Sequence, residues 1–416
     1  MNRPILPALL TTLAFSSPAF GIELTENAQI HGFLNQAYLY SPDNPYAGTD
    51  ADDGSLKFRE VGVNGFVELS PEFRLAGQVL SRRQDEADDG DVRVDFLLAD
   101  YLIFSDQDTT LGIRAGRVKN NIGFYNAIRD IPSARPGYNV PESIYFEAFR
   151  DTLLSVDGAN LYGSALLGGS QLSWEVAGGE RKVDSEEFEQ FAFGGRISNR
   201  ESEDIPLWLL HVNLVPAFER DLRIALSLVD LKVDLDGIRS IQEAQAALIA
   251  APPGDILVNP QAYITDAEFD ALFAIFSVQY SFDDWVITAE YLNLDSEFEA
   301  DILGQPTSDS VTTEGYYLQL EWLATLETSW FARYEELYLD KDDRSGNSIG
   351  RPNNRYRGYG KGWTLGGKWQ FAPSWSLIGQ ASFNEGTAWL PVYEGRENED
   401  LQKYWNYYVL SLNFQF

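Results

Sequence analysis

The sequence predicts an all-β protein, a closed antiparallel transmembrane β-barrel of about sixteen strands with short periplasmic turns and long extracellular loops. Three observations lead to this prediction. Apolar and polar residues alternate in segments of about ten residues, the length that a tilted strand needs to cross a bilayer. Short turns and longer polar stretches follow these segments in alternation. Aromatic residues gather at the ends of the segments, where a membrane interface favours them.

The C-terminal segment, YYVLSLNFQF at residues 407–416, shows the alternation clearly. Tyr408, Leu410, Leu412, Phe414 and Phe416 share one face of an extended strand, because successive side chains point to opposite sides. The other face is mostly polar. A strand of this kind can separate lipid from water.

Sixteen segments of this type run along the chain, an even number, as a closed barrel with both termini on one side requires. They span residues 28–40, 56–69, 72–83, 92–104, 109–118, 151–165, 169–180, 205–216, 220–232, 268–281, 284–297, 310–323, 328–340, 358–371, 375–386 and 401–416. FEQFAFGGRI, residues 188–197, alternates as well, but a strand there would leave a neighbour without a partner. We assign it to a loop, with a short helix as one option.

Residues 1–21 have the pattern of a secretory signal peptide. Arg3 precedes an apolar stretch, and small residues stand before the expected cleavage point at Ile22. The apolar stretch is too short to span a membrane as a helix. We therefore expect residues 22–416 to form one barrel domain beyond the inner membrane.

The composition excludes several classes of function. A formal net charge of −32 makes nucleic acid an unfavourable partner. The chain has no cysteine, which excludes disulfides and thiolate metal sites, and we expect no cofactor and no bound metal. The acidic residues form short runs in predicted loops, where they are solvated or, as a sharper alternative, bind divalent cations together with lipopolysaccharide.

The alternation also assigns the faces of the barrel. On the third strand Leu75 and Val79 should face lipid, while Arg74 and Gln78 should face the lumen. Ionisable groups are costly to bury in a dry interior, so we expect a water-filled lumen. The charged residues expected on its wall are Arg74, Arg114, Arg223, Glu290, Glu321, Arg333 and Lys368. The alternation by itself also allows a soluble barrel with an apolar interior.

The segment at residues 119–150 is the most unusual in the chain, because it combines basic, aromatic and proline residues in an acidic protein. A loop of this length is often functional, and its aromatic residues argue against disorder. We expect it to fold into the barrel and narrow the lumen. The residues expected at this constriction are Arg117, Lys119, Arg129, Arg135, Tyr138 and Arg150. Alternatively, Arg129–Asp130 and Arg150–Asp151 are ion pairs that hold the loop to the wall.

A second long loop is expected at residues 233–267. Within it, IQEAQAALIAA favours a helix that ends before Pro252, so this loop should be partly helical.

The stretch GRVKNNIGFYNAIRDIPSARPGYNVPESIY resembles the third-loop region of proteobacterial porins, in the broad superfamily of the phosphate-selective porins O and P. The resemblance implies a sixteen-stranded homotrimer with Arg117, Lys119, Arg129 and Arg135 near the constriction. The lysine-rich lumen that phosphate selectivity requires is missing here, so phosphate specificity is not expected. The final strand is similar to those of Gram-negative outer-membrane proteins, in which a terminal phenylalanine, here Phe416, is read by the barrel-assembly machinery.

Together these features predict a passive channel for small hydrophilic solutes or ions, surrounded by outer-membrane lipid and lipopolysaccharide. An enzyme is not expected, because the two histidines, His31 and His211, lie in predicted strands outside any catalytic motif. A non-conducting structural or adhesive barrel is the main alternative. A channel for hydrophobic solutes would need a more apolar wall. The solute, the preference for anions or cations, and the oligomeric state stay open.

Overall fold

A computed structural model describes residues 21–49, 53–84, 88–183, 203–235, 238–257, 260–347, 355–390 and 401–416. The first twenty residues of the predicted signal peptide and the segment at 188–197 lie outside these ranges.

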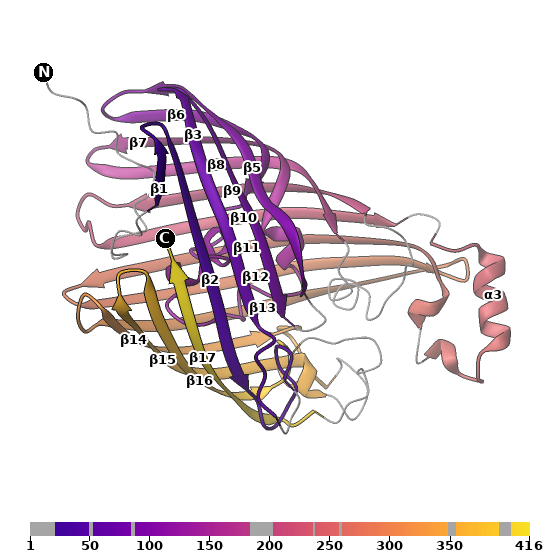
Figure 1. Cartoon of the computed structure of the whole chain (residues 1–416). Coiled ribbons are helices and arrows are strands. Elements are labelled where there is room, and N and C mark those ends of the chain that lie inside the picture. Colours follow the sequence, from indigo (N-terminus) through magenta and orange to yellow (C-terminus); the bar gives the residue numbers. More distant parts are fainter. Residues whose placement is uncertain are drawn as a thin grey trace, which may run out of the picture.

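Sixteen antiparallel strands close into one barrel, which confirms the predicted fold class (Figure 1). They are β2 (Ala28–Tyr40), β3 (Arg59–Ser70), β4 (Phe73–Gln84), β5 (Asp88–Ser105), β6 (Thr109–Lys119), β7 (Ser155–Leu167), β8 (Ser170–Val183), β9 (Glu203–Val215), β10 (Leu222–Leu235), β11 (Ile264–Phe282), β12 (Trp285–Ile302), β13 (Gln305–Leu323), β14 (Thr328–Tyr338), β15 (Tyr359–Ala372), β16 (Trp375–Gly386) and β17 (Tyr404–Gln415). Each strand pairs with the next along the chain, and β17 closes the sheet by pairing with β2, as in Phe414 opposite Leu34.

One additional short strand, β1 (Ile22–Thr25), pairs with the start of β2. Ile22 lies opposite Ile30, and Phe416 exchanges two backbone hydrogen bonds of 3.0 Å with Gly32. β1 therefore lies in line with β17 on the same edge of β2, so Ile22 and Phe416 come close together there. Four residues are too few for alternation to be visible, which is why the sequence did not predict this strand.

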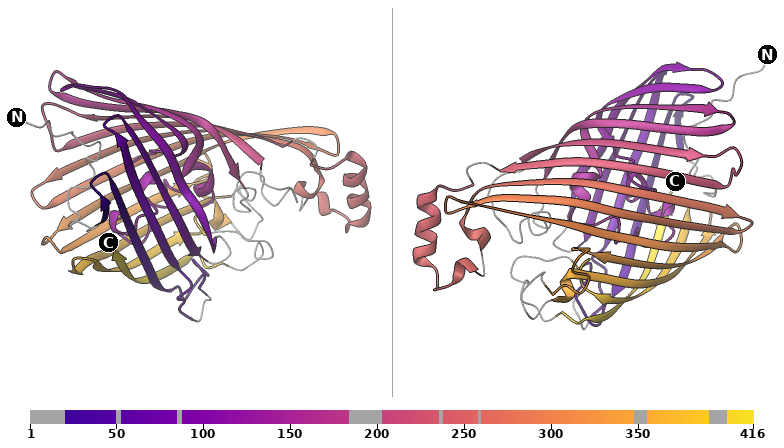
Figure 2. Two further views of the ribbon diagram at one scale, coloured as in Figure 1. Left: turned by 45° about the horizontal axis from the view of Figure 1, so that its top comes forward. Right: turned by 180° about the vertical axis from the view of Figure 1, so that it is seen from behind.

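The two rims differ, as predicted. β1 and the C-terminal end of β17 lie toward the rim with the tight turns, and helix α3 (Ile241–Ala250) lies beyond the opposite rim (Figure 2). Ser240 caps α3 in a reciprocal capping box with Glu243, which confirms the helix expected in this loop.

The predicted strands at 284–297 and 310–323 leave residues 298–309 as a connection, but the structure has no long loop there. β12 and β13 instead extend to a two-residue turn at Leu303 and Gly304, whose φ angles are 54° and 78°. Two successive positive φ values are typical of a hairpin turn that matches the twist of its strands. The polar residues of this stretch belong to a hairpin that rises above the barrel.

Short helices occupy the long connections: α1 (Arg150–Leu153), η1 (Asn126–Ile128), η2 (Pro132–Ala134), η3 (Asp255–Leu257), η4 (Pro260–Tyr263) and η5 (Arg355–Gly358). None of the helices in the described ranges is both long and apolar enough to span a membrane.

Outward-facing aromatic residues form a continuous belt near the loop rim along half of the circumference, and Trp208 on β9 is a further exposed one beside Gly178. Eight neighbouring strands, β11 to β17 and β2, each contribute one: Phe276, Tyr291, Tyr316, Tyr334, Trp363, Phe383, Tyr408 and Tyr40. Most of these side chains are exposed, which suits amphipathic rings at a headgroup layer. On β3, β4, β6, β7 and β8 the outward positions toward this rim carry Val61, Val79, Ala115, Ala159 and Gly178.

Candidate functional site: the loop inside the barrel

The chain between β6 and β7, residues 120–154, folds inward and crosses the interior of the barrel, as predicted. We call this segment the inner loop. It contains η1, η2 and α1. Most of its side chains are buried, although the segment is not part of the sheet. It contacts the wall on three sides, and each side uses a different kind of interaction.

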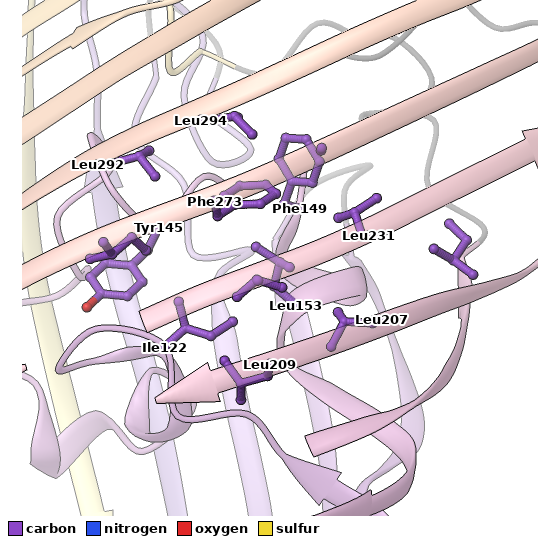
Figure 3. Close-up of a cluster of buried hydrophobic side chains, with 14 of the residues drawn as sticks. Ile122, Tyr145, Phe149, Leu153, Leu207, Leu209, Leu231, Phe273, Leu292 and Leu294 are labelled. Atoms are coloured by element: carbon purple, nitrogen blue, oxygen red, sulfur yellow. The ribbon is translucent and has the colours of Figure 1, made fainter. Parts of the chain in front are cut away.

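Against β9 to β12 the inner loop forms a hydrophobic core (Figure 3). The Phe149 ring meets the Phe273 ring edge-on, with centroids 5.1 Å apart. The loop side of this core includes Ile122, Tyr145, Phe149 and Leu153, and the wall side includes Leu207, Leu209, Leu231, Phe273, Leu292 and Leu294. The prediction of a polar, hydrated inner face is therefore wrong for this sector. These strands are apolar on both faces because the loop covers the inner one.

Glu290 of β12 accepts four hydrogen bonds, two from the inner loop and two from neighbouring strands. Its carboxylate accepts from the Phe124 amide at 2.8 Å and from the Tyr145 hydroxyl at 2.7 Å. The hydroxyls of Ser277 and Tyr317 complete the set at 2.6 and 2.8 Å. A fully hydrogen-bonded carboxylate tolerates burial, so this predicted wall residue holds the loop instead of facing the solute.

Polar contacts hold the middle of the inner loop to β14 and β16. Glu335 accepts from the Ser143 amide at 3.0 Å, and the Arg333 guanidinium bonds the side-chain oxygen of Asn139 at 3.3 Å. Gln380 accepts from the Tyr138 amide at 2.9 Å. On β15, Lys368 donates to the Ser133 carbonyl. Two of the predicted wall cations, Arg333 and Lys368, are thus engaged by the loop.

Ion pairs hold the third side of the inner loop to β3, β4 and β5. Arg135 meets Glu60 at 2.7 Å, and Arg82 meets Glu147 at 2.6 Å. Glu147 is also 3.0 Å from Arg129. Although burial alone would raise the pKa of Glu147, the three arginines around it, Arg82, Arg129 and Arg150, lower it to about 2. The carboxylate therefore stays charged and paired.

A second ionic cluster joins the two ends of the inner loop. Asp130 accepts from Arg150 and lies 2.9 Å from Lys119, which also reaches Asp95 at 2.8 Å. Asp95 is the extra residue of a β-bulge in β5, since Gln78 and Val79 pair with Phe96 and Val94 on either side of it. A bulge reorients a side chain in this way, and alternation in the sequence does not reveal it.

The predicted constriction residues are therefore held in structural contacts. Arg150 lies 3.7 Å from Asp151, as the ion-pair alternative expected, whereas the ion-pair partner of Arg129 is Glu147 and not Asp130. Tyr138 is buried against the ring of Phe58, with centroids 4.8 Å apart. The carboxylates that neutralise these residues lie far away in the sequence, so only the structure reveals the pairs.

Arg117 was expected at the constriction and lies elsewhere. It pairs with Asp157 at 2.6 Å and stands across from Leu97, which is 61% exposed. Leu97 belongs to the outer face of β5, so the Arg117–Asp157 pair lies on the outside of the barrel. The alternation within β6, in which Arg114 faces inward, is consistent with this placement.

Beneath the inner loop, toward the turn rim, the wall carries the remaining predicted cations. Arg74 and Arg114 share Asp100 at 2.9 and 3.4 Å, and Arg114 stacks over Tyr162 with its guanidinium carbon 4.1 Å from the ring centroid. Arg223 stacks over Phe124 of the inner loop at 4.3 Å. Glu321 of β13 lies near Lys368 of β15, on another part of the wall.

A serine–histidine contact also lies under the inner loop, with His211 Nδ1 2.8 Å from the Ser227 hydroxyl. Ser227 is 1% exposed, and its oxygen accepts from the Gly123 amide at 2.9 Å. A hydroxyl that is covered by the loop and already bonded to it serves as an anchor. The geometry gives it no access to a substrate.

Comparisons with known proteins agree with this architecture. No protein-family model matches the chain, and no curated protein matches its sequence. Among solved structures, the outer-membrane expressed OmpT of Vibrio cholerae is similar with a TM-score of 0.53 at 12% identity, covering 94% of this chain and 99% of that one. An anion-selective porin from Comamonas acidovorans gives a TM-score of 0.53 at 13% identity, with coverages of 94% and 99%. The outer membrane channel DcaP of Acinetobacter baumannii gives 0.53 at 9% identity, with 95% and 99%. The chain shares their fold.

Proposed function

We propose that this protein is an outer-membrane porin, a channel for passive diffusion of small hydrophilic solutes or ions. The observation that carries the proposal is the inner loop, which enters a sixteen-stranded barrel and is fixed to its wall from Glu60 on β3 to Glu335 on β14. A loop fixed on several sides gives a channel a constant width and a defined set of lining charges. No energy source or cofactor is needed.

The shared fold with outer-membrane channels supports this proposal, as does the resemblance of the inner loop to the third-loop region of the superfamily that includes the phosphate-selective porins O and P. The lumen gives no reason to assign phosphate specificity, because Arg135, Arg129 and Lys119 are all paired with carboxylates. A general channel fits these contacts better.

We infer that copies of this chain associate, as a homotrimer, through the outer face of β3 to β8. The aromatic belt that marks contact with lipid headgroups stops before this sector. Small residues such as Ala115 and Ala159 permit the close approach of another barrel. The Arg117–Asp157 pair on this face is better accommodated by a protein neighbour than by hydrocarbon.

The remaining surroundings follow from an outer-membrane location. The belt residues would meet lipid and lipopolysaccharide, and residues 1–21 would be removed during export. Phe416 ends the strand that closes the barrel, with its backbone bonded to Gly32, and we assign it as the signal for the barrel-assembly machinery.

Single-channel conductance of refolded protein in a planar bilayer tests the proposal. Discrete current steps are expected, together with compact migration of the unboiled protein on a gel. The inner loop is bonded to several parts of the barrel wall, so the alternative result is that it closes the lumen completely. A folded barrel that passes no current would favour the structural or adhesive alternative, to which the projecting hairpin and α3 would be suited.

A further inference from the structure

The charges that were expected to select solutes at the inner loop cancel one another. Arg129, Arg135, Arg150 and Lys119 each have a carboxylate oxygen at 3.0 Å or closer. A guanidinium that is paired at such distances presents little net field to a passing ion. Selectivity must then arise from charges outside the loop.

Arg223 on β10 differs from the other arginines predicted for the pore, each of which has a carboxylate oxygen within 4 Å, and from Lys368, which donates to the inner loop. Among the described residues, no carboxylate oxygen lies within 4 Å of its guanidinium, and its Nη1 is buried without a hydrogen-bond acceptor. Its Nε donates to the side-chain oxygen of Asn213 at 2.7 Å. Glu290 acts on it electrostatically from farther away, but the four donors described above already occupy that carboxylate.

The position of Arg223 is fixed and faces the interior. It is the inward residue just before Ala225 on β10, it is half-buried, and it stacks on Phe124. The wall beside it is polar and uncharged: Gln279 is its cross-strand partner and donates to Thr288 at 3.0 Å. A guanidinium that lies over a ring, with an uncharged cross-strand neighbour, is preorganised for a planar oxyanion.

We propose that Arg223 forms an anion-binding subsite under the inner loop, which takes a carboxylate or phosphate group of a passing solute through the guanidinium donor that has no acceptor in the protein. This inference rests on the proposed channel function. It assigns anion preference to one wall residue instead of to the basic inner loop.

The test is the reversal potential of a planar bilayer in a KCl gradient, measured for the wild type and for Arg223→Gln. Loss of one unit charge next to the path should lower the chloride-to-potassium permeability ratio roughly tenfold, about threefold from each ion, if both ions pass about 6 Å from the guanidinium in water. Arg220→Gln is the matched control, because it removes an exposed positive charge from the nearby turn without touching Phe124. It should leave the ratio close to that of the wild type.

A second readout separates binding from charge. Succinate should reduce the chloride current of the wild type in a saturable way, and Arg223→Lys should keep the ion selectivity while it loses most of this block. If Arg223→Gln does not refold, Phe124→Ala replaces it, since it removes the supporting ring and should weaken the block.

Two results would overturn the inference: an unchanged permeability ratio in Arg223→Gln, or an equal change in Arg220→Gln. A wild-type protein that passes no current at all would instead refute the channel function.

Discussion

At the scale of single residues, Gly315 of β13 shows how closely the inner loop approaches the wall. A Cβ atom added there would collide with the carbonyl oxygen of Ser143, whose amide is bonded to Glu335. No side chain larger than hydrogen fits without moving the loop. The glycine is therefore required by the loop and not by the strand.

Gly315→Ala should loosen the inner loop at Ser143, with a cost of about 1–3 kcal/mol for the docked state, because overpacking forces the backbone apart. The measurement is the hydrogen-exchange protection of the Ser143 amide, which should fall. Gly379→Ala on β16 is the control, since a Cβ atom there would meet nothing within 4 Å. Equal protection in the two variants would contradict the close packing described here.

At the scale of elements, the contact between the inner loop and β14 should depend on pH. Burial, and next the charge of Glu335, raise the pKa of Glu142 to about 8, although Arg333 and a 2.6 Å hydrogen bond from the Tyr46 hydroxyl oppose this shift. Glu147 on the loop adds a further negative charge. When the inner loop is in contact with β14, Glu142 therefore binds its proton more tightly than when the loop is detached from the wall.

Because the pKa of Glu142 is raised, the contact between the inner loop and β14 is strongest below pH 4.5, the ordinary pKa of a glutamate. The contact weakens as the pH rises from 4.5 to about 8. The protection of the Ser143 amide, corrected for intrinsic exchange rates, should decrease over this range. Glu142→Gln should remove the dependence and retain the protected state at high pH. Glu219→Gln, in an exposed turn, should behave like the wild type. A wild-type profile in Glu142→Gln would refute this assignment.

The strands could be predicted from the sequence because lipid on one side imposes a regular alternation. All sixteen predicted segments overlap an observed strand, and the segments at 28–40 and 375–386 have the observed bounds. Where both faces are apolar, as on parts of β9 to β12, the apolar run still indicates a strand but does not show what covers its inner face.

The inner loop could be located but not interpreted from sequence. Its length and composition predicted an inward fold, yet the partners of its arginines, such as Glu60 and Glu147, depend on contacts between distant strands and the loop. Even Arg117 was misplaced, because it stands one residue from the inward face of a strand that runs directly into the loop.

At the scale of the whole molecule, the gap in the aromatic belt predicts which face meets a second copy. The chain has no cysteine, so single cysteines can be introduced and joined with a short bismaleimide. Ala115→Cys should yield covalent oligomers, whereas Leu365→Cys, which is 50% exposed on β15, should stay monomeric after denaturation. The reverse pattern would place the interface on the belt side.

Because β1 and β17 meet along β2, the pairing of the strands does not depend on where along the barrel the chain begins. Ile22 and Phe416 lie opposite positions of β2 that are two residues apart, so a short linker could join them without disturbing the neighbouring ladders. Circular permutation would then move the ends of the chain to another loop while every strand keeps its partners. Only the order in which the strands leave the ribosome would change, and Phe416 would keep its place in the wall while it ceased to be a terminus.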